Sequence, residues 1–226
     1  MYGALPKPPE IHEYFYFAEN CVMNRSFFPL IAFVLPFLFV FSCAGFQGLN
    51  KAPPETAVEK PERPVLIMGK GLVGEENMAL FLLRNNPQAD GDFVRKLARF
   101  YTEEAAFEGI NHDVAFSQMC LETGFLSYGG LVQPEWNNFC GLGAIGPEQP
   151  GLVFSDPRTG VRAHIQHLKA YATEEPLKGE LVDPRYKYVR KGSSPVIEGL
   201  SGTWAADKLY SVKISSILQR LYEFSF

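Results

Sequence analysis

The chain has 226 residues and a formal net charge of -4 at pH 7, which is enough length for one ordinary domain with extensions. Hydrophobic residues make up 46% and charged residues 20% of the sequence, a composition typical of globular proteins. No basic run points to nucleic acid, and the mildly acidic balance gives no electrostatic footprint for a membrane surface. We therefore exclude nucleic acid as a partner.

A secretory signal is predicted at residues 23–43. Arg25 precedes an uncharged apolar run from Phe27 to Phe41, which ends just before Cys43. The run is shorter than the ~20 residues needed to span a bilayer, and two prolines interrupt it. A cleaved signal therefore fits better than a transmembrane helix.

The end of this signal resembles the lipobox of bacterial lipoproteins. A small residue precedes Cys43, and Ala44 and Gly45 follow it, so the resemblance implies that Cys43 becomes the lipidated first residue. The alternative is a secreted protein cut near Ala44. We interpret residues 1–22 as a leader from a misassigned translation start; if they are translated, the signal is internal and the lipoprotein interpretation weakens.

Residues 44–64 are predicted to be a disordered linker. Most of this segment is rich in Pro, Lys and Glu and has no apolar periodicity. Behind a lipid anchor such a spacer would let a tethered domain reach its target. An ordinary disordered leader has the same composition.

The folded domain is expected over residues 65–226, and its class is mainly α with at most a small β-hairpin. Apolar residues recur at helical spacing over residues 75–83 and 91–110, and a third short helix is expected between Asn111 and Gly124. The first helix is expected to end at the Asn-Asn-Pro sequence that follows it.

In the second half of the domain, residues 146–160 contain three prolines between two glycines and are predicted to be a loop, or a small hairpin at most. Helices are predicted again from Val161 to Ala172 and from Trp204 onward, the latter with an apolar stripe that docks on the core. The aromatic segment 183–189 is predicted to be extended.

The helix after Asn111 has almost no polar face, so it is expected to be buried on nearly all sides. Glu122 lies in its last turn, where burial and the negative end of the helix dipole both raise a carboxyl pKa. A carboxylic acid that keeps its proton near neutral pH is what a general acid requires. Gln118, one turn earlier, is expected to hydrogen-bond Glu122. The competing interpretation is a solvated glutamate at a helix end.

The loop that follows has the groups of a sugar-binding site. Tyr128, Trp136 and Phe139 are aromatic faces on which pyranose rings can stack. Asn137 and Asn138 offer amide donors and acceptors for hydroxyl or acetamido groups. A turn without a ligand is the competing interpretation of the same residues.

Together, the FSQMCLETGFL helix and the WNNFCGLGAIG loop resemble the bacterial glucosaminidase family, glycoside hydrolase family 73, which cleaves the N-acetylglucosaminyl linkage of peptidoglycan. GVRAHIQHLKAYA and VDPRYKYV are also similar to that family. The resemblance implies a lysozyme-like helical domain over about residues 65–226. It places Glu122 on the catalytic acid, and Asn137, Asn138 and Phe139 on the loop that lines the cleft.

Glycosidic cleavage also needs a group that stabilises or attacks the oxocarbenium-like centre. Asp156 is our candidate for a second catalytic carboxylate, with Glu135 and Glu148 as the other nearby acids. The acetamido group of the substrate is an alternative to a protein nucleophile. In that case Tyr186 or Tyr188, similar to the family's tyrosine-bearing segment, positions the acetamido group or a water.

His164 and His167 are neighbours on one helix face, but no third ligand accompanies them. We therefore predict no metal site and no cofactor, and interpret both as core histidines. Cys120 and Cys140 are either a disulfide or, as we favour, two small buried thiols.

The sequence thus predicts a monomeric peptidoglycan hydrolase, an endo-β-N-acetylglucosaminidase in the cell envelope, anchored to a membrane through lipid on Cys43. A lytic transglycosylase and a catalytically silent wall-binding lipoprotein are the alternatives.

Overall fold

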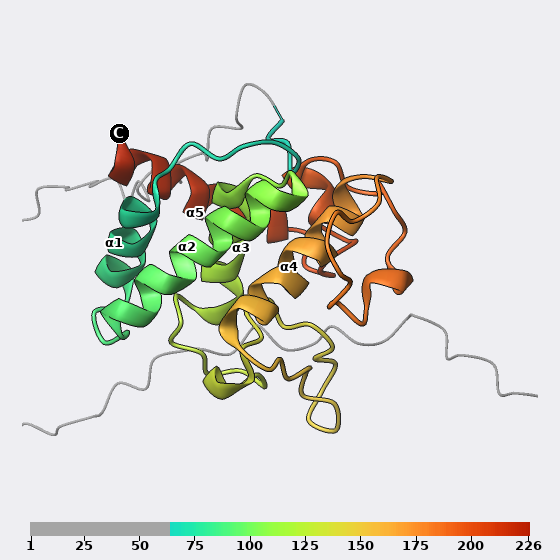
Figure 1. The fold of residues 1–226 in the computed structure, drawn as a ribbon, viewed down its shortest axis with the longest axis horizontal. Helices are drawn as coiled ribbons and strands as arrows, with labels where there is room; N and C mark the ends of the chain where they lie inside the picture. Colours follow the sequence, from blue (N-terminus) through green and yellow to red (C-terminus); the bar gives the residue numbers. More distant parts are fainter. Residues whose placement is uncertain (1–63) are drawn as a thin grey trace, which may run out of the picture. The chain divides into compact units, whose positions relative to one another are not determined.

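The computed structural model describes residues 64–226. The predicted leader, the signal with Cys43 and nearly all of the linker lie outside these residues. The described part contains five α-helices and three short 3-10 helices (Figure 1). In chain order they are α1 Glu75–Asn85, α2 Gly91–Glu108, α3 His112–Thr123, η1 Pro134–Trp136, α4 Pro157–Ala172, η2 Tyr186–Tyr188, η3 Ile197–Leu200 and α5 Tyr210–Ser225.

The mainly α class predicted from the sequence is confirmed. Pairing of extended backbone within residues 64–226 is limited to isolated bridges, such as those between Leu66 and Val196 and between Met68 and Ile110. A bridge between Gly146 and Gln149 closes a tight turn, so the segment that follows the predicted cleft loop is a turn without strands. None of the helices in residues 64–226 has the length and apolar character needed to cross a membrane.

Helix α3 is the centre of the domain and contacts α2, α4 and α5 (Figure 1). Its side chains are buried from His112 to Cys120, as its apolar sequence predicts. Asn111 caps its first turn by accepting a hydrogen bond from the Asp113 amide, and Gly124 ends it in the left-handed conformation. Both ends are therefore fixed where the sequence places them.

One buried ion pair and a partly exposed group of ionic contacts join α2 to α4. Lys169 and Glu108 form an ion pair of 2.8 Å with both side chains 1% exposed, and Glu104 accepts hydrogen bonds from Arg158 and Arg162. Breaking a buried pair on one side leaves an uncompensated charge in the core, which costs about 3–5 kcal/mol. These contacts hold α4 in one register against α2.

Three predicted boundaries are wrong. Helix α4 begins at Pro157, before Val161, because the Asp156 side chain caps it. The segment around Tyr186 turns through η2 and is not extended. The last helix begins at Tyr210, after Trp204, because the Asp207 carboxylate accepts the Leu209 amide in a turn.

Candidate active site

Glu122 lies at the end of α3 and keeps an exposed surface. Its two carboxyl oxygens have different surroundings. Oε1 accepts hydrogen bonds from the hydroxyl of Tyr210 and from the indole nitrogen of Trp204, the latter at 3.2 Å. Oε2 faces the loop at Gly141, where a side-chain carbon would come within 3.8 Å of it. Oε1 is therefore occupied by two donors, and Oε2 is the oxygen directed toward the loop.

Protein atoms crowd around the Glu122 carboxyl although solvent reaches it. This loss of water raises its pKa to about 7, against the hydrogen bonds from Tyr210 and Trp204, which favour the ionised form. A glutamate that retains its proton near neutral pH matches the expectation drawn from the helix.

Tyr210 and Trp204 are site residues that the sequence analysis missed. They lie 88 and 82 positions after Glu122 in the chain, so no local pattern links them to it. Tyr210 is buried as the first residue of α5, and Trp204 is half-buried between the two histidine rings of α4 and Glu122. In the sequence, the one feature that could have pointed to them is that two large aromatic residues, Trp204 and Tyr210, lie at the start of the last amphipathic segment.

Gln118 does not bond to Glu122 directly and does not reach the surface. It is fully buried, and its amide nitrogen donates to the Tyr210 hydroxyl at 2.8 Å. A side chain without exposed surface cannot touch a ligand in this conformation, so its predicted role in binding substrate gains no support from its position. It reaches Glu122 through Tyr210.

Two of the predicted loop contacts are also structural. Asn138 is 1% exposed; its amide donates to the carbonyls of Leu142 and Leu152, and its oxygen accepts the Leu142 amide. Phe139 is 1% exposed and belongs to the main core. Neither side chain has the exposed surface that a contact with a sugar requires in this conformation. Asn138 instead holds the loop backbone together, and Phe139 packs in the core.

Asn137 joins this loop to α4. Its backbone is left-handed, with φ 52°, and its side chain donates to the Phe154 carbonyl at 3.1 Å. A side-chain carbon at Gly160 in α4 would lie 1.8 Å from the Asn137 carbonyl oxygen. Only glycine lets the helix approach this closely.

Tyr128 and Trp136 are half-buried and keep exposed surface. Burial, with a contribution from Glu135, raises the pKa of Tyr128 to about 12, so the phenol stays neutral. Stacking of sugar rings on these two aromatic groups stays a prediction.

Asp156 is the N-terminal cap of α4. One carboxylate oxygen accepts the Thr159 amide at 3.0 Å, and the other accepts the hydroxyls of Ser155 and Thr159. The hydrogen bonds from Thr159 hold the pKa of Asp156 below its ordinary value. The structure thus engages both oxygens of Asp156 in the helix cap.

Tyr186 and Tyr188 do not contact Glu122. The amine of Lys191 lies over the Tyr186 ring and donates to the Tyr186 carbonyl, and Tyr188 is 69% exposed. Their predicted role, which is to position the acetamido group of the substrate or a water, stays a prediction.

The two histidines are satisfied inside the domain, as predicted. His164 is fully buried between Tyr101 and Gln118, and His167 pairs with Asp183 at 2.7 Å. Within residues 64–226 no cluster of three or more His, Cys, Asp or Glu side chains is arranged to hold a metal. Cys120 and Cys140 are free, buried thiols, so the disulfide alternative is wrong.

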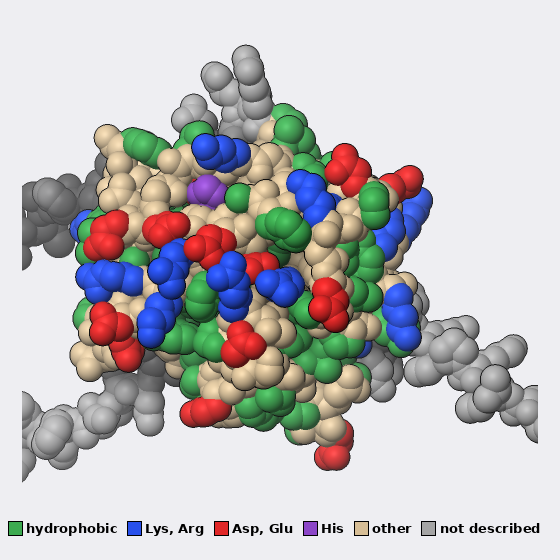
Figure 2. Space-filling model, viewed as in Figure 1, with side chains coloured by type: hydrophobic (Ala, Val, Ile, Leu, Met, Phe, Trp, Pro, Cys, Tyr) green, Lys and Arg blue, Asp and Glu red, His purple; other side chains and the backbone are tan. Residues whose placement is uncertain are grey.

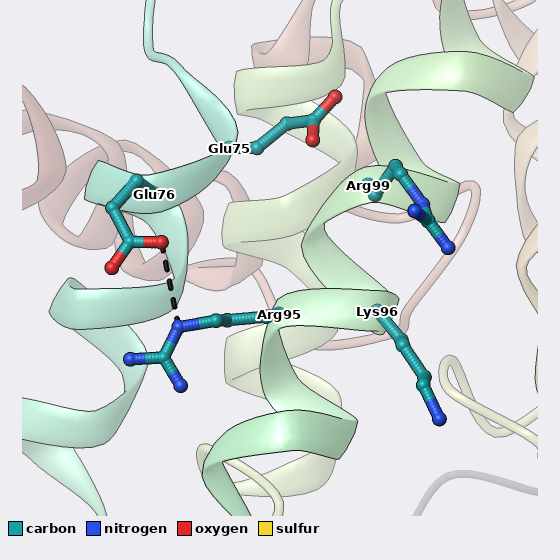
Figure 3. A pocket seen from close by; sticks show the side chains of 5 residues that line it. All are labelled: Glu75, Glu76, Arg95, Lys96 and Arg99. Atoms are coloured by element: carbon teal, nitrogen blue, oxygen red, sulfur yellow. Dashed lines mark ion pairs between the residues drawn. The ribbon is translucent and has the colours of Figure 1, made fainter.

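Two surface hollows lie away from Glu122. One, of about 260 Å³, is lined by Glu75, Glu76, Arg95, Lys96 and Arg99 of α1 and α2 (Figure 3). The other is lined by Phe81, Arg84, Asn85, Arg220, Glu223 and Phe224. Figure 2 shows basic and acidic side chains interleaved on the face that carries the first hollow. Both signs of charge are therefore present beside this hollow.

Comparison with known proteins identifies relatives. Residues 98–223 match the model of the family described as Glucosaminidase: Mannosyl-glycoprotein endo-beta-N-acetylglucosaminidase. An uncharacterized protein of Borreliella burgdorferi is 40% identical over 170 residues, which cover 75% of this chain and 83% of that relative.

Two solved structures of S. aureus autolysin E are also similar. One is a complex with the muropeptide NAM-L-Ala-D-iGlu; it shows a TM-score of 0.46, 14% identity, and coverage of 70% of this chain and 71% of that chain. The other is a catalytic mutant in complex with the disaccharide NAG-NAM; it shows a TM-score of 0.47, 12% identity, and coverage of 73% and 74%.

Proposed function

This chain belongs to the mannosyl-glycoprotein endo-beta-N-acetylglucosaminidase family and is a glycoside hydrolase, and we propose that it cleaves peptidoglycan. The bond is the N-acetylglucosaminyl-β-1,4-N-acetylmuramyl linkage, and Glu122 is the general acid. The observation that carries the proposal is the Glu122 carboxyl itself, whose pKa is raised to about 7 and whose Oε1 receives two hydrogen bonds.

The two carboxyl oxygens of Glu122 have different hydrogen-bond partners, and this difference favours a proton on Oε2. Oε1 accepts from Tyr210 and Trp204, which leaves Oε2 to carry the proton toward the loop at Gly141. Transfer of this proton to the glycosidic oxygen accompanies cleavage of the bond from C1 to that oxygen. The two donors on Oε1 then stabilise the carboxylate that forms.

In the same step, the substrate's own acetamido group serves as the nucleophile. Both carboxylate oxygens of Asp156 are engaged in capping α4, which favours substrate assistance over a nucleophilic Asp156. The acetamido carbonyl oxygen attacks C1 as the glycosidic bond breaks, and water then opens the resulting ring, with Glu122 as the base that takes the water's proton.

The test is mass spectrometry of soluble fragments after purified peptidoglycan is digested with the full-length chain, with Glu122→Gln and with Glu223→Gln. Glu223 is an exposed glutamate of α5 paired only with Gln219 within residues 64–226, so its variant is a matched control. We expect fragments with reducing-end N-acetylglucosamine from the wild type and from Glu223→Gln, and a loss of at least about 100-fold in Glu122→Gln.

Other products identify the alternatives. Anhydro-muramyl ends would make the protein a lytic transglycosylase. Intact binding to the wall without fragments from any variant would make it a binding protein.

A further inference from the structure

A continuous series of buried hydrogen bonds runs through the core to Glu122. It begins at the Tyr101 hydroxyl of α2, which lies 2.9 Å from Nδ1 of His164 in α4. Nε2 of His164 lies 3.0 Å from Oε1 of Gln118 in α3. Gln118 then donates to Tyr210 at 2.8 Å, and Tyr210 donates to Glu122. The four residues before Glu122 are 0–5% exposed.

The first two members fix the tautomer of the histidine. The Tyr101 hydroxyl has no second hydrogen-bond partner within residues 64–226, so its proton points to Nδ1 of His164. Burial lowers the pKa of His164 to about 3, and the ring is therefore neutral. With Nδ1 as acceptor, the single ring proton is on Nε2 and is donated to Gln118.

The histidine in turn fixes the amide of Gln118. Its oxygen accepts from His164, so its nitrogen faces Tyr210 and donates to that hydroxyl. Tyr210 accepts this bond and keeps its own proton for Glu122. If the amide were rotated by half a turn, Tyr210 would donate to Gln118, and Glu122 would have to give its acid proton to the Tyr210 oxygen.

We propose that Tyr101, His164 and Gln118 are positioning residues, which act through Tyr210 to keep the acid proton of Glu122 on Oε2. This rests on the proposed function, in which Glu122 is the general acid. None of the three bonds to Glu122, and each is fully buried. Their effect on the reaction therefore passes through the direction of the hydrogen bonds.

Few other groups that can ionise surround Glu122. Tyr210 approaches from α5 and Cys140 from the loop; burial, with contributions from Glu122, raises the pKa of each well above its usual value. Both are therefore neutral when Glu122 titrates. The pair of His167 with Asp183 lies behind the Trp204 ring, and no ion pair involves Glu122 in the part of the chain that the structure describes.

The test compares Tyr101→Phe, Tyr210→Phe, the double variant and Tyr222→Phe by activity against pH. Tyr222 is the matched control, since its hydroxyl bonds to buried Asp113, away from Glu122. Tyr210→Phe is expected to lower kcat at least about tenfold, and Tyr101→Phe about fivefold, with little change in KM. In both, the alkaline limb of kcat moves to higher pH, because Glu122 loses a donor to its ionised form.

The double variant separates positioning from a structural role. If Tyr101 acts through Tyr210, the double variant has the kcat and pH profile of Tyr210→Phe alone. Losses that multiply, or a Tyr101→Phe profile identical to that of Tyr222→Phe, would overturn the inference. If Tyr101→Phe does not fold, the comparison uses His164→Gln, which keeps an N–H donor for Gln118 and should retain the wild-type profile, beside His164→Leu, which should not.

A second measurement is independent of activity. Nitrogen-15 NMR of the full chain, with His164 assigned through its variant, is expected to show a neutral ring protonated at Nε2 between pH 5 and 8. An Nδ1–H ring overturns the inference. If the wild type releases no fragments, the proposed function fails, and this NMR measurement still decides whether the hydrogen bonds run in the proposed direction.

Discussion

Glu122 shows how one side chain obtains an acid's properties from its position. Helix α3 is buried along nearly its whole length, and its last turn brings the carboxyl among protein atoms while leaving it accessible. Loss of water raises the pKa of Glu122 to about 7. The folded state therefore holds the Glu122 proton to a higher pH than the unfolded chain does.

This difference predicts a pH-dependent gain in stability for Glu122→Gln. The stabilisation from the protonated carboxyl is fully present below the ordinary value of 4.5 and is lost as pH rises through about 7. The neutral amide has no such loss. We expect the Tm of Glu122→Gln, minus that of the wild type, to increase between pH 4.5 and pH 8 when both are measured by scanning fluorimetry. A constant difference across this range would contradict the raised pKa.

The sequence pattern singles out Glu122 as a candidate acid but does not reveal which of the residues around it are buried. The carboxylate stood out because an acid at the end of an apolar helix needs an explanation. Gln118 and Asn138 carry amides that bind sugars as readily as they bind backbone, and only burial separates the two uses: each is at most 1% exposed. Tyr210 could not be assigned, since it meets Glu122 only after α5 packs on α3.

At the level of elements, the start of α4 was misplaced although its signals are local. Asp156 followed by Pro157 is a cap and a first helical residue, but the prolines of the preceding segment favoured a longer loop. The last helix was misplaced in the opposite direction. Lys213 and the Leu209 amide both bond to Asp207 and keep residues 204–209 out of the helix.

Because α4 packs closely against the loop at Gly160, we expect that adding one methyl group there lowers the stability of the fold. Gly160→Ala would place a carbon 1.8 Å from the Asn137 carbonyl oxygen, so helix and loop must separate. We expect a loss of about 3 kcal/mol in the free energy of unfolding, measured by urea denaturation. Gly130→Ala is the control, because nothing lies within 4 Å of a side chain there. Equal stabilities of the two variants would contradict this prediction, because they would show that the loop can move away from α4 without loss of stability.

For the whole molecule, the family match over residues 98–223 and the helical architecture agree with what the sequence predicts. Apolar periodicity located α1 and α2, because each buries one side of its surface. Helix α3 is buried on nearly all sides, and the residues at its two ends, Asn111 and Gly124, located it. The arrangement of the helices around Glu122 depends on contacts between segments far apart in the chain, which periodicity does not encode.

The predicted lipid anchor concerns residues outside the described range. We propose that Cys43 is lipidated, so that Cys43→Ser moves the protein from the membrane fraction to the soluble fraction when both are expressed in a bacterial host. Mass spectrometry of the wild-type N-terminal peptide should show an added diacylglyceryl group. Equal partitioning of the two proteins would favour the alternative of a secreted chain cut near Ala44.

Both hydrogen-bond donors to Glu122 come from residues near the end of the described chain, 82 and 88 positions after it. A ribosome therefore makes the acid long before it makes Trp204 and Tyr210. Until these residues emerge and α5 packs on α3, the Glu122 carboxyl lacks both partners on Oε1. A hydrolase built in this order lacks both donors until residues 204–210 have been made, and an interrupted chain that ends before Trp204 is released without either donor.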